Sequence, residues 1–327
     1  MTEIDSHSRL ARQHAYEYDM AVQTPKLLVP ERQPFTLEVE NSTSNRIRTE
    51  ADLPTRETLG ELFDLNKLNP CAGPIAVEGA EPGDVLAVDI LDIVVAETGY
   101  VCLEGLGPLA ESLRYPEARG PFTKIIDHLP GPSGTTSDGV GVFDDNVRWN
   151  LQPMIGTLGL APQRTTRGSD TVTMQNRHGG NLDTREFRRG HRILLPVAHP
   201  GGLLYVGDVH ASQASEFGGT GDESRADVTL SCTVLKNTTI PWVRVETPTE
   251  IIQLNCHRPI DEGIRQANLW MLDWLVEEYA MSARDATLQL AVNPDVRNNI
   301  YSLSMWGTMN FTVGVSFPKS SIPTLHH

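Results

Sequence analysis

The chain has 327 residues, of which 39% are hydrophobic and 21% are charged, a composition typical of a folded globular protein. Its formal net charge of −15 excludes nucleic acid and an anionic membrane surface as expected partners, because either would need a basic surface. The polar start has no apolar core of a signal peptide and no apolar run is long enough to cross a membrane, so we expect a cytoplasmic protein.

The first half of the chain is predicted to be a polar arm followed by strands. Residues 1–24 are polar and predict the arm, and FTLEVE over 35–40 alternates as a half-buried strand does. Two strands joined by a Pro-Gly-Asp turn follow over 73–95. From Gly99 to about Gly141, many glycines and prolines predict a long irregular segment.

The second half combines further strands with two helices. Helical spacing of apolar residues predicts one helix over about 259–279 and a second over 283–292, capped by Ser282. Strands are predicted from the β-branched and apolar runs at 150–162, 191–197, 203–209, 226–235, 242–252 and 301–317. The first of these runs is also compatible with a loop lying against a ligand.

These elements predict a mainly β fold of the α+β class, with sandwich-like or barrel-like halves and a helical pair near the C-terminus. We divide the chain into the arm 1–24, an N-terminal β-rich part 25–180, a C-terminal β-rich part 181–318 that carries both helices, and a tail 319–327.

The residues able to do chemistry concentrate between Gly179 and Glu223. Asp208 and His210 follow an apolar run and lie two residues apart, so both project from the same face of the predicted strand. They suit either a metal site or a carboxylate that orients a histidine base; the ordinary alternative is a surface pair at a strand end.

Three further acids are candidates with equally ordinary alternatives. Asp183 ends a Gly-Gly-Asn turn, and in the ordinary alternative its side chain would only cap its own backbone. Glu216 and Glu223 lie among glycines, which let a backbone approach a ligand closely but are also typical of a solvated loop. No HExxH, GxSxG or phosphate-binding P-loop motif is present.

Five blocks of sequence carry a family resemblance. They read NPCAGPIAVEGAEPGDVLAVDILDI, PMIGTLGLAP, GGNLD, GHRILLPV and GGLLYVGDVHASQ. In this order, over roughly residues 25–315, the chain resembles the acetamidase/formamidase family. The resemblance implies hydrolysis of a small amide, a β-rich fold, a metal-dependent site and self-association to a homodimer or a larger homo-oligomer.

The resemblance also implies roles for individual residues. A divalent metal, zinc in the first place and otherwise Mn, Ni or Fe, would be held by Asp183, Asp208, His210 and Glu223. Glu216 would act as the catalytic base, with Asp183 and His210 also in the reaction. The neighbours expected to contact the substrate are Gly180, Asn181, Gln213 and Gly219.

The sequence departs from the family pattern after His210. Where the family usually reads Gln-Gly-Asp-Gly-Glu, this chain has Gln213-Ala214-Ser215-Glu216, one residue shorter. The family's Gly-Thr-Ala-Ile-Glu is replaced by Gly219-Thr220-Gly221-Asp222-Glu223. We interpret these changes as a reshaped pocket, which would suit a bulkier amide, a urea, a carbamate or a lactam.

Two other hypotheses stay open. One is a metal-free amidase in which a carboxylate or Lys124 serves the chemistry. Independently of this choice, His128 could enter the site as a lid residue. The other is a catalytically inactive homologue that only binds a small molecule, although such a protein would have no physical need to keep Asp183, Asp208 and His210.

Overall fold

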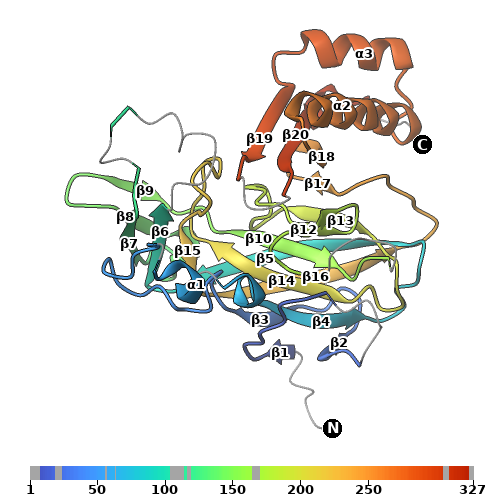
Figure 1. Cartoon of the computed structure of the whole chain (residues 1–327). Coiled ribbons are helices and arrows are strands. Elements are labelled where there is room, and N and C mark those ends of the chain that lie inside the picture. Colours follow the sequence, from blue (N-terminus) through green and yellow to red (C-terminus); the bar gives the residue numbers. More distant parts are fainter. Residues whose placement is uncertain are drawn as a thin grey trace.

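The computed structural model describes residues 8–18, 24–55, 57–62, 64–103, 114–115, 119–163, 170–304 and 309–323 (Figure 1). The expected arm, the expected irregular segment over 99–141 and the expected tail therefore lie partly outside the described residues. In the ranges given, no helix is long and apolar enough to cross a membrane.

A mostly antiparallel sheet forms the first layer. Its central strand pair, β5 and β16, follows the β-branched runs of the sequence, and most of the side chains of both strands are buried. Among the described residues this sheet has nine strands, in the order β1 (Ser8–Leu10), β3 (Phe35–Val39), β16 (Ala226–Leu235), β5 (Val85–Val95), β13 (Arg192–Pro196), β17 (Arg244–Glu246), β18 (Glu250–His257), β20 (Phe311–Pro318) and β19 (Arg297–Ser302).

The second sheet has eleven strands within the described part of the chain. Nine follow one another in the order β11 (Gln175–Asn176), β12 (Gly179–Asn181), β10 (Met154–Leu160), β14 (Leu204–His210), β15 (Glu223–Ser224), β6 (Thr98–Leu103), β7 (Phe122–Leu129), β8 (Val140–Val142) and β9 (Arg148–Asn150). The remaining two, β4 (Cys71–Val77) and β2 (Leu27–Val29), continue from β14. Strands β10 and β14 are buried at every position, as strands covered on both faces are.

The hydrophobic core lies between the two sheets. It joins side chains such as Phe35 and Leu86 from the first sheet to Ile155, Leu158 and Val206 from the second. Each sheet combines strands from before and after residue 180: β16 lies between β3 and β5, and β10 pairs with β14. The mainly β, α+β fold class predicted from the sequence is confirmed.

The helical pair covers the end of the first sheet that β18 and β20 form (Figure 1). Helix α2 (Ile260–Glu277) buries Met271, Trp274 and Leu275 against these strands. Helix α3 (Ala283–Val292) begins after Ser282, whose hydroxyl accepts a hydrogen bond from the Asp285 backbone N–H, so the predicted cap is confirmed. A short helix, α1 (Leu59–Leu62), lies in the polar segment before β4.

The prediction of an irregular segment over 99–141 was wrong for the part of it that the structure describes, where strands β6, β7 and β8 lie. Strands β6 and β7 pair along their length, and β8 continues the sheet. Gly120-Pro121 and the glycines near Gly131 delimit these strands and concealed β7, which buries Thr123, Ile126 and His128 without regular alternation. Turn residues at the ends of short strands were interpreted as one long loop.

Arg244 attaches α2 to the sheet. Its guanidinium is 2% exposed, pairs with Glu278, donates to Gln253 Oε1 at 3.0 Å and lies 4.2 Å from the centre of the Trp274 ring. The Arg244 side of the pair is therefore shielded from solvent, and the lower local dielectric strengthens its hydrogen bonds.

We predict that Arg244→Ala lowers the free energy of unfolding by about 2 kcal/mol, because it removes charged hydrogen bonds and a cation–ring contact together. Urea denaturation measures this. The matched control is Arg265→Ala, which removes another Arg–Glu pair of α2 whose arginine is 57% exposed and should leave the midpoint nearly unchanged. Equal midpoints for the two variants would contradict the role given to Arg244.

Candidate functional site

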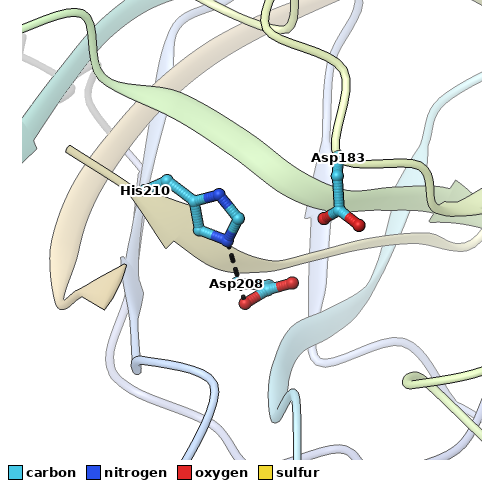
Figure 2. Close-up of side chains that lie close together, drawn as sticks. All are labelled: Asp183, Asp208 and His210. Atoms are coloured by element: carbon cyan, nitrogen blue, oxygen red, sulfur yellow. Dashed lines mark ion pairs between the residues drawn. The ribbon is translucent and has the colours of Figure 1, made fainter. Parts of the chain in front are cut away.

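Strand β14 delivers the central pair of the site. Asp208 and His210 are both buried, and His210 Nε2 lies 3.5 Å from Asp208 Oδ1 (Figure 2). The sequence periodicity placed them on one face, and their side chains do converge. The backbone of Asp208 has φ of 55°, a left-handed conformation that Asp tolerates better than most residues.

Two other strand ends bring further acids to this pair. Asp183 follows β12, and one ligand atom each from Asp183, Asp208 and His210 lie within 4.8 Å of one another (Figure 2). These three residues form a group able to hold a metal ion. Glu223 in β15 is paired opposite His210 in the sheet, and its Oε1 is 3.1 Å from His210 Nε2.

Several ligand-type atoms in this group are buried without a hydrogen-bond partner among the described residues. They are Asp183 Oδ2, Asp208 Oδ1, His210 Nε2 and Glu223 Oε2. A buried polar atom that lacks a partner costs stability, so four of them around one point need an explanation. A cation held by Asp183, Asp208 and His210 would give these three residues a partner, and their donor set of carboxylate oxygens and one imidazole nitrogen fits a divalent metal.

Gln213 holds His210 in the form that a metal would require. The side-chain oxygen of Gln213 lies 2.7 Å from His210 Nδ1, and its amide nitrogen donates to the carbonyl oxygens of Asp183 at 2.6 Å and Tyr301 at 3.1 Å. Since the Gln213 oxygen can only accept, Nδ1 carries the proton and Nε2 presents its lone pair to the site in the neutral ring.

Asp208 is held by residues that the sequence analysis did not single out. Asn69 donates to Asp208 Oδ2 at 3.0 Å, and the Thr157 hydroxyl lies 3.4 Å from the same oxygen. A Cβ on Gly156 would lie 2.9 Å from a carboxylate oxygen of both Asp183 and Asp208. In the sequence, Asn69 before Pro70 indicated only a turn. In the structure Asn69 has φ of 45°, a left-handed turn conformation.

Burial and mutual repulsion disfavour the charged form of several carboxylic acids of the site. Burial and the negative charge of Glu216 raise the pKa of Asp183 well above its usual value. Burial raises the pKa of Asp208 to about 6, with Glu223 adding to the shift. Burial also raises the pKa of Glu216. These shifts mean that the cluster keeps protons unless another positive charge replaces them.

His210 supplies the positive charge that the neighbouring acids favour. Burial alone would lower the pKa of His210, but Glu223 and Asp208 outweigh it and the pKa is raised well above its usual value. Burial likewise opposes ionisation of Glu223, yet His210 keeps the pKa of Glu223 below its usual value. The pair therefore behaves as an ion pair in the absence of a metal.

A polar cavity opens beside these groups. Its volume is about 40 Å³ for the centres of water molecules, which corresponds to roughly three waters. Glu216 closes one side and accepts a hydrogen bond from the Ser302 hydroxyl at 3.3 Å. The lining includes Ser42, Leu68, Asn69, Val172, Asn181, Asp208, Glu216, Gly219, Thr220, Glu223, Ser304 and Met309.

The residues expected to contact the substrate occupy different places. Asn181 and Gly219 line the cavity, and Gln213 contacts His210 behind it. Gly180 is buried in β12, where a Cβ would lie 2.0 Å from the Met174 carbonyl oxygen, and it is not among the described lining residues. Ser304, which sequence reasoning missed, lines the cavity with a buried hydroxyl that has no partner among the described residues.

His128 and Lys124 lie outside the cavity lining that the described residues form. His128 is buried, with Nδ1 2.8 Å from the Ala96 carbonyl oxygen and Nε2 3.1 Å from an Asp222 carboxylate oxygen. Lys124 pairs with Glu50 at 2.9 Å. Both ring nitrogens of His128 face acceptors, so it fastens the segment that precedes Glu223 to β7.

The fold and this site define a two-sheet protein with a buried acidic centre able to hold a metal. The model of the Acetamidase/Formamidase family matches residues 24–167 and 154–253, more than half of the chain. The chain therefore belongs to the acetamidase/formamidase family.

Individual relatives agree with this assignment. An acetamidase from Mycolicibacterium smegmatis is 32% identical over 220 residues, covering 50% of this chain and 53% of that protein. A formamidase from Methylophilus methylotrophus is 28% identical over 201 residues, covering 46% of this chain and 47% of that protein. The chain spans about half the length of the curated relatives it matches. The crystal structure of an acetamidase from Bacillus halodurans superposes with a TM-score of 0.81 at 29% identity, covering 95% of this chain and 97% of that one.

We predict that Gly156→Ala disturbs this centre. The new methyl group would approach the Asp208 carbonyl oxygen to 2.7 Å and the carboxylates of Asp183 and Asp208 to 2.9 Å, so strand β14 and both carboxylates must shift. Metal affinity should fall about 10- to 100-fold, as it does when the support of metal ligands is altered. Equilibrium dialysis with zinc measures this, and Gly60→Ala, whose Cβ would have no neighbour within 4 Å, is the matched control. Unchanged affinity in the Gly156 variant would contradict the arrangement.

Proposed function

We propose that the chain is an amidohydrolase that cleaves the C–N bond of a small amide with a metal-activated water and releases ammonia or an amine. The observation that carries this proposal is a set of four buried ligand atoms beside one small cavity that have no hydrogen-bond partner among the described residues. Membership of the family, and the names acetamidase and formamidase that its relatives bear, support the reaction class.

The residues proposed to hold the cation are Asp183, Asp208, His210 and Glu223, with zinc as the first choice and Mn, Ni or Fe as alternatives. Support comes from the mixed oxygen and nitrogen donors and from Gln213, which leaves His210 Nε2 free to bind. When bound, a divalent ion acts as a Lewis acid that lowers the pKa of water toward neutrality and polarises a carbonyl oxygen.

Glu216 is proposed as the group that moves the proton. Its carboxylate is buried at the cavity beside Asp183, and burial raises its pKa, as a group that both accepts and donates a proton near neutral pH requires. Glu216 takes a proton from the attacking water and passes it to the amide nitrogen as the C–N bond breaks. The nitrogen then leaves as neutral ammonia or amine, and the acyl carbon keeps the oxygen of water.

The cavity wall supplies polar contacts for the amide group itself. The Asn181 side chain and the Ser304 hydroxyl both line the cavity, and Ser304 has no other partner among the described residues. Room for roughly three waters matches the three or four heavy atoms of an amide group with one small substituent. A urea, carbamate or lactam group presents the same atoms, and we propose these as alternative substrates of the same site.

We predict that two substitutions separate metal binding from proton transfer. Glu216→Gln should keep the metal but lower kcat for hydrolysis of the substrate by about 10²- to 10⁴-fold, because the glutamine side chain cannot take up the proton of the attacking water. His210→Ala should lose the metal and the activity together. Metal analysis of the purified protein and ammonia release from acetamide are the measurements, with the exposed Glu97→Gln as control. Full activity after complete removal of the metal would overturn the metal role.

We predict that metal affinity depends on pH through Asp208. Burial raises the pKa of Asp208 to about 6, so below that pH a proton occupies the carboxylate that the cation needs. Affinity should fall about tenfold or more for each pH unit below about pH 6. It should still rise above pH 6, because His210, whose pKa is raised well above its usual value, must also lose its proton before it binds a metal. Titration calorimetry with manganese from about pH 7.5 down to about pH 5 tests this. An affinity that does not change over this interval would argue against Asp208 as a ligand.

A further inference from the structure

A second, larger chamber adjoins the reaction cavity. It lies between the segment that joins β14 to β15 and the strands β6, β7 and β9. Figure 1 shows these strands on the left, away from helices α2 and α3. The volume of the chamber is about 540 Å³ for the centres of water molecules, which is within the range of small-molecule sites. Its apolar wall consists of Val101, Ile126, Phe143 and Trp149.

The two aromatic rings of this chamber are held in place by the protein. The Trp149 indole N–H donates to the Ser212 hydroxyl at 2.9 Å, and a Cβ on Gly141 would lie 3.0 Å from the same indole. Phe143 meets Trp149 in a tilted arrangement with ring centroids 6.1 Å apart, yet remains 37% exposed. The Lys124 ammonium also lies 5.7 Å from the centre of the Phe143 ring. The indole of Trp149, which its hydrogen bond holds in place, forms a preorganised surface for an apolar group, and the partly exposed Phe143 ring extends this surface.

The chamber and the reaction cavity share two wall residues. Glu216 and Thr220 line both, so the proposed proton-transfer group stands at their boundary. Thr220 is fixed there, because its hydroxyl donates to the Cys102 carbonyl oxygen and accepts from the Cys102 backbone N–H, both at 3.1 Å. A molecule whose amide group lies beside Glu216 therefore has the chamber as the adjacent space.

The two spaces differ in size and character. The cavity has room for an amide group with one small substituent, whereas the chamber is more than ten times larger. Four large apolar side chains form one part of the chamber wall, and polar side chains such as Gln152, Gln213 and Asp222 form the rest. An amide with a ring-sized substituent would fit only if that substituent occupied the chamber. Burial of apolar area against Trp149 and Phe143 would then contribute to its binding.

We propose that this chamber is a substrate subsite that binds an apolar, ring-sized substituent of the amide. The inference rests on the proposed amide hydrolysis and deepens it by naming the substrate class. The substituent is carried either by the acyl carbon or by the amide nitrogen, and both present the same apolar chemistry to the rings.

The test compares three amides on the metal-loaded full-length protein. Acetamide has no ring, phenylacetamide carries one on the acyl side, and N-benzylacetamide carries one on the nitrogen. In Trp149→Ala, the kcat/KM of at least one ring-bearing amide relative to that of acetamide should fall at least about tenfold. Whichever amide responds identifies the side of the substituent. Phe143→Ala should lower the same ratio, and it keeps the test valid if the Trp149 variant does not fold.

The matched control is Trp270→Ala, which removes an indole that stacks on Trp242 away from both spaces and should leave the ratio unchanged. A ratio that stays the same in the Trp149 and Phe143 variants would overturn the subsite. So would a wild-type protein that hydrolyses acetamide but neither ring-bearing amide.

Failure of the proposed function is a separate outcome. If no amide is hydrolysed, the amidase proposal fails, and the subsite is tested by binding alone. Phenylacetate should then change the tryptophan fluorescence of the wild-type protein, and the change should be absent in Trp149→Phe. A fluorescence change that persists in Trp149→Phe, or none in the wild type, would overturn the subsite.

Discussion

The mutual repulsion of buried carboxylates is the constraint on which the site depends. Asp183, Asp208, Glu216 and Glu223 are all buried within a small region that holds one imidazole. Four ionised acids there would repel one another strongly in the low-dielectric interior. The raised pKa values show that protons are one way to neutralise them, and a divalent cation on the unpaired atoms is another.

The two-sheet fold makes this concentration of charge sustainable. Strand ends from β12, β14 and β15 deliver the acids, and the hydrogen-bonded ladders between neighbouring strands prevent them from moving apart. Asn69, Asp183 and Asp208 each have a left-handed backbone, which costs free energy for a residue other than glycine. Three such residues around one point indicate that the surrounding core, rather than local preference, holds the site together.

The sequence predicted what is local and missed what is not. Helices α2 and α3 and strand β14 were visible because their periodicity extends over many residues, whereas β6 and β7 were concealed by the glycines and prolines at their ends. The pairing of Asp208 with His210 followed from a two-residue spacing. The contact of Asn69 with Asp208 spans 139 residues, and neither periodicity nor spacing could have found it. The same holds for the hydrogen bond from the Trp149 indole to the Ser212 hydroxyl, which joins residues 63 positions apart.

The segment from Gln213 to Glu223 lies close against the centre. At Gly221, a Cβ would lie 2.4 Å from His210 Nδ1. The next residue, Asp222, pairs with the buried His128. The backbone therefore lies closer to His210 than an alanine would allow, and the buried pair fixes it there. One side of this segment then faces the reaction cavity while the other lines the aromatic chamber, so a change in these few residues alters both the support of the centre and the space beside it.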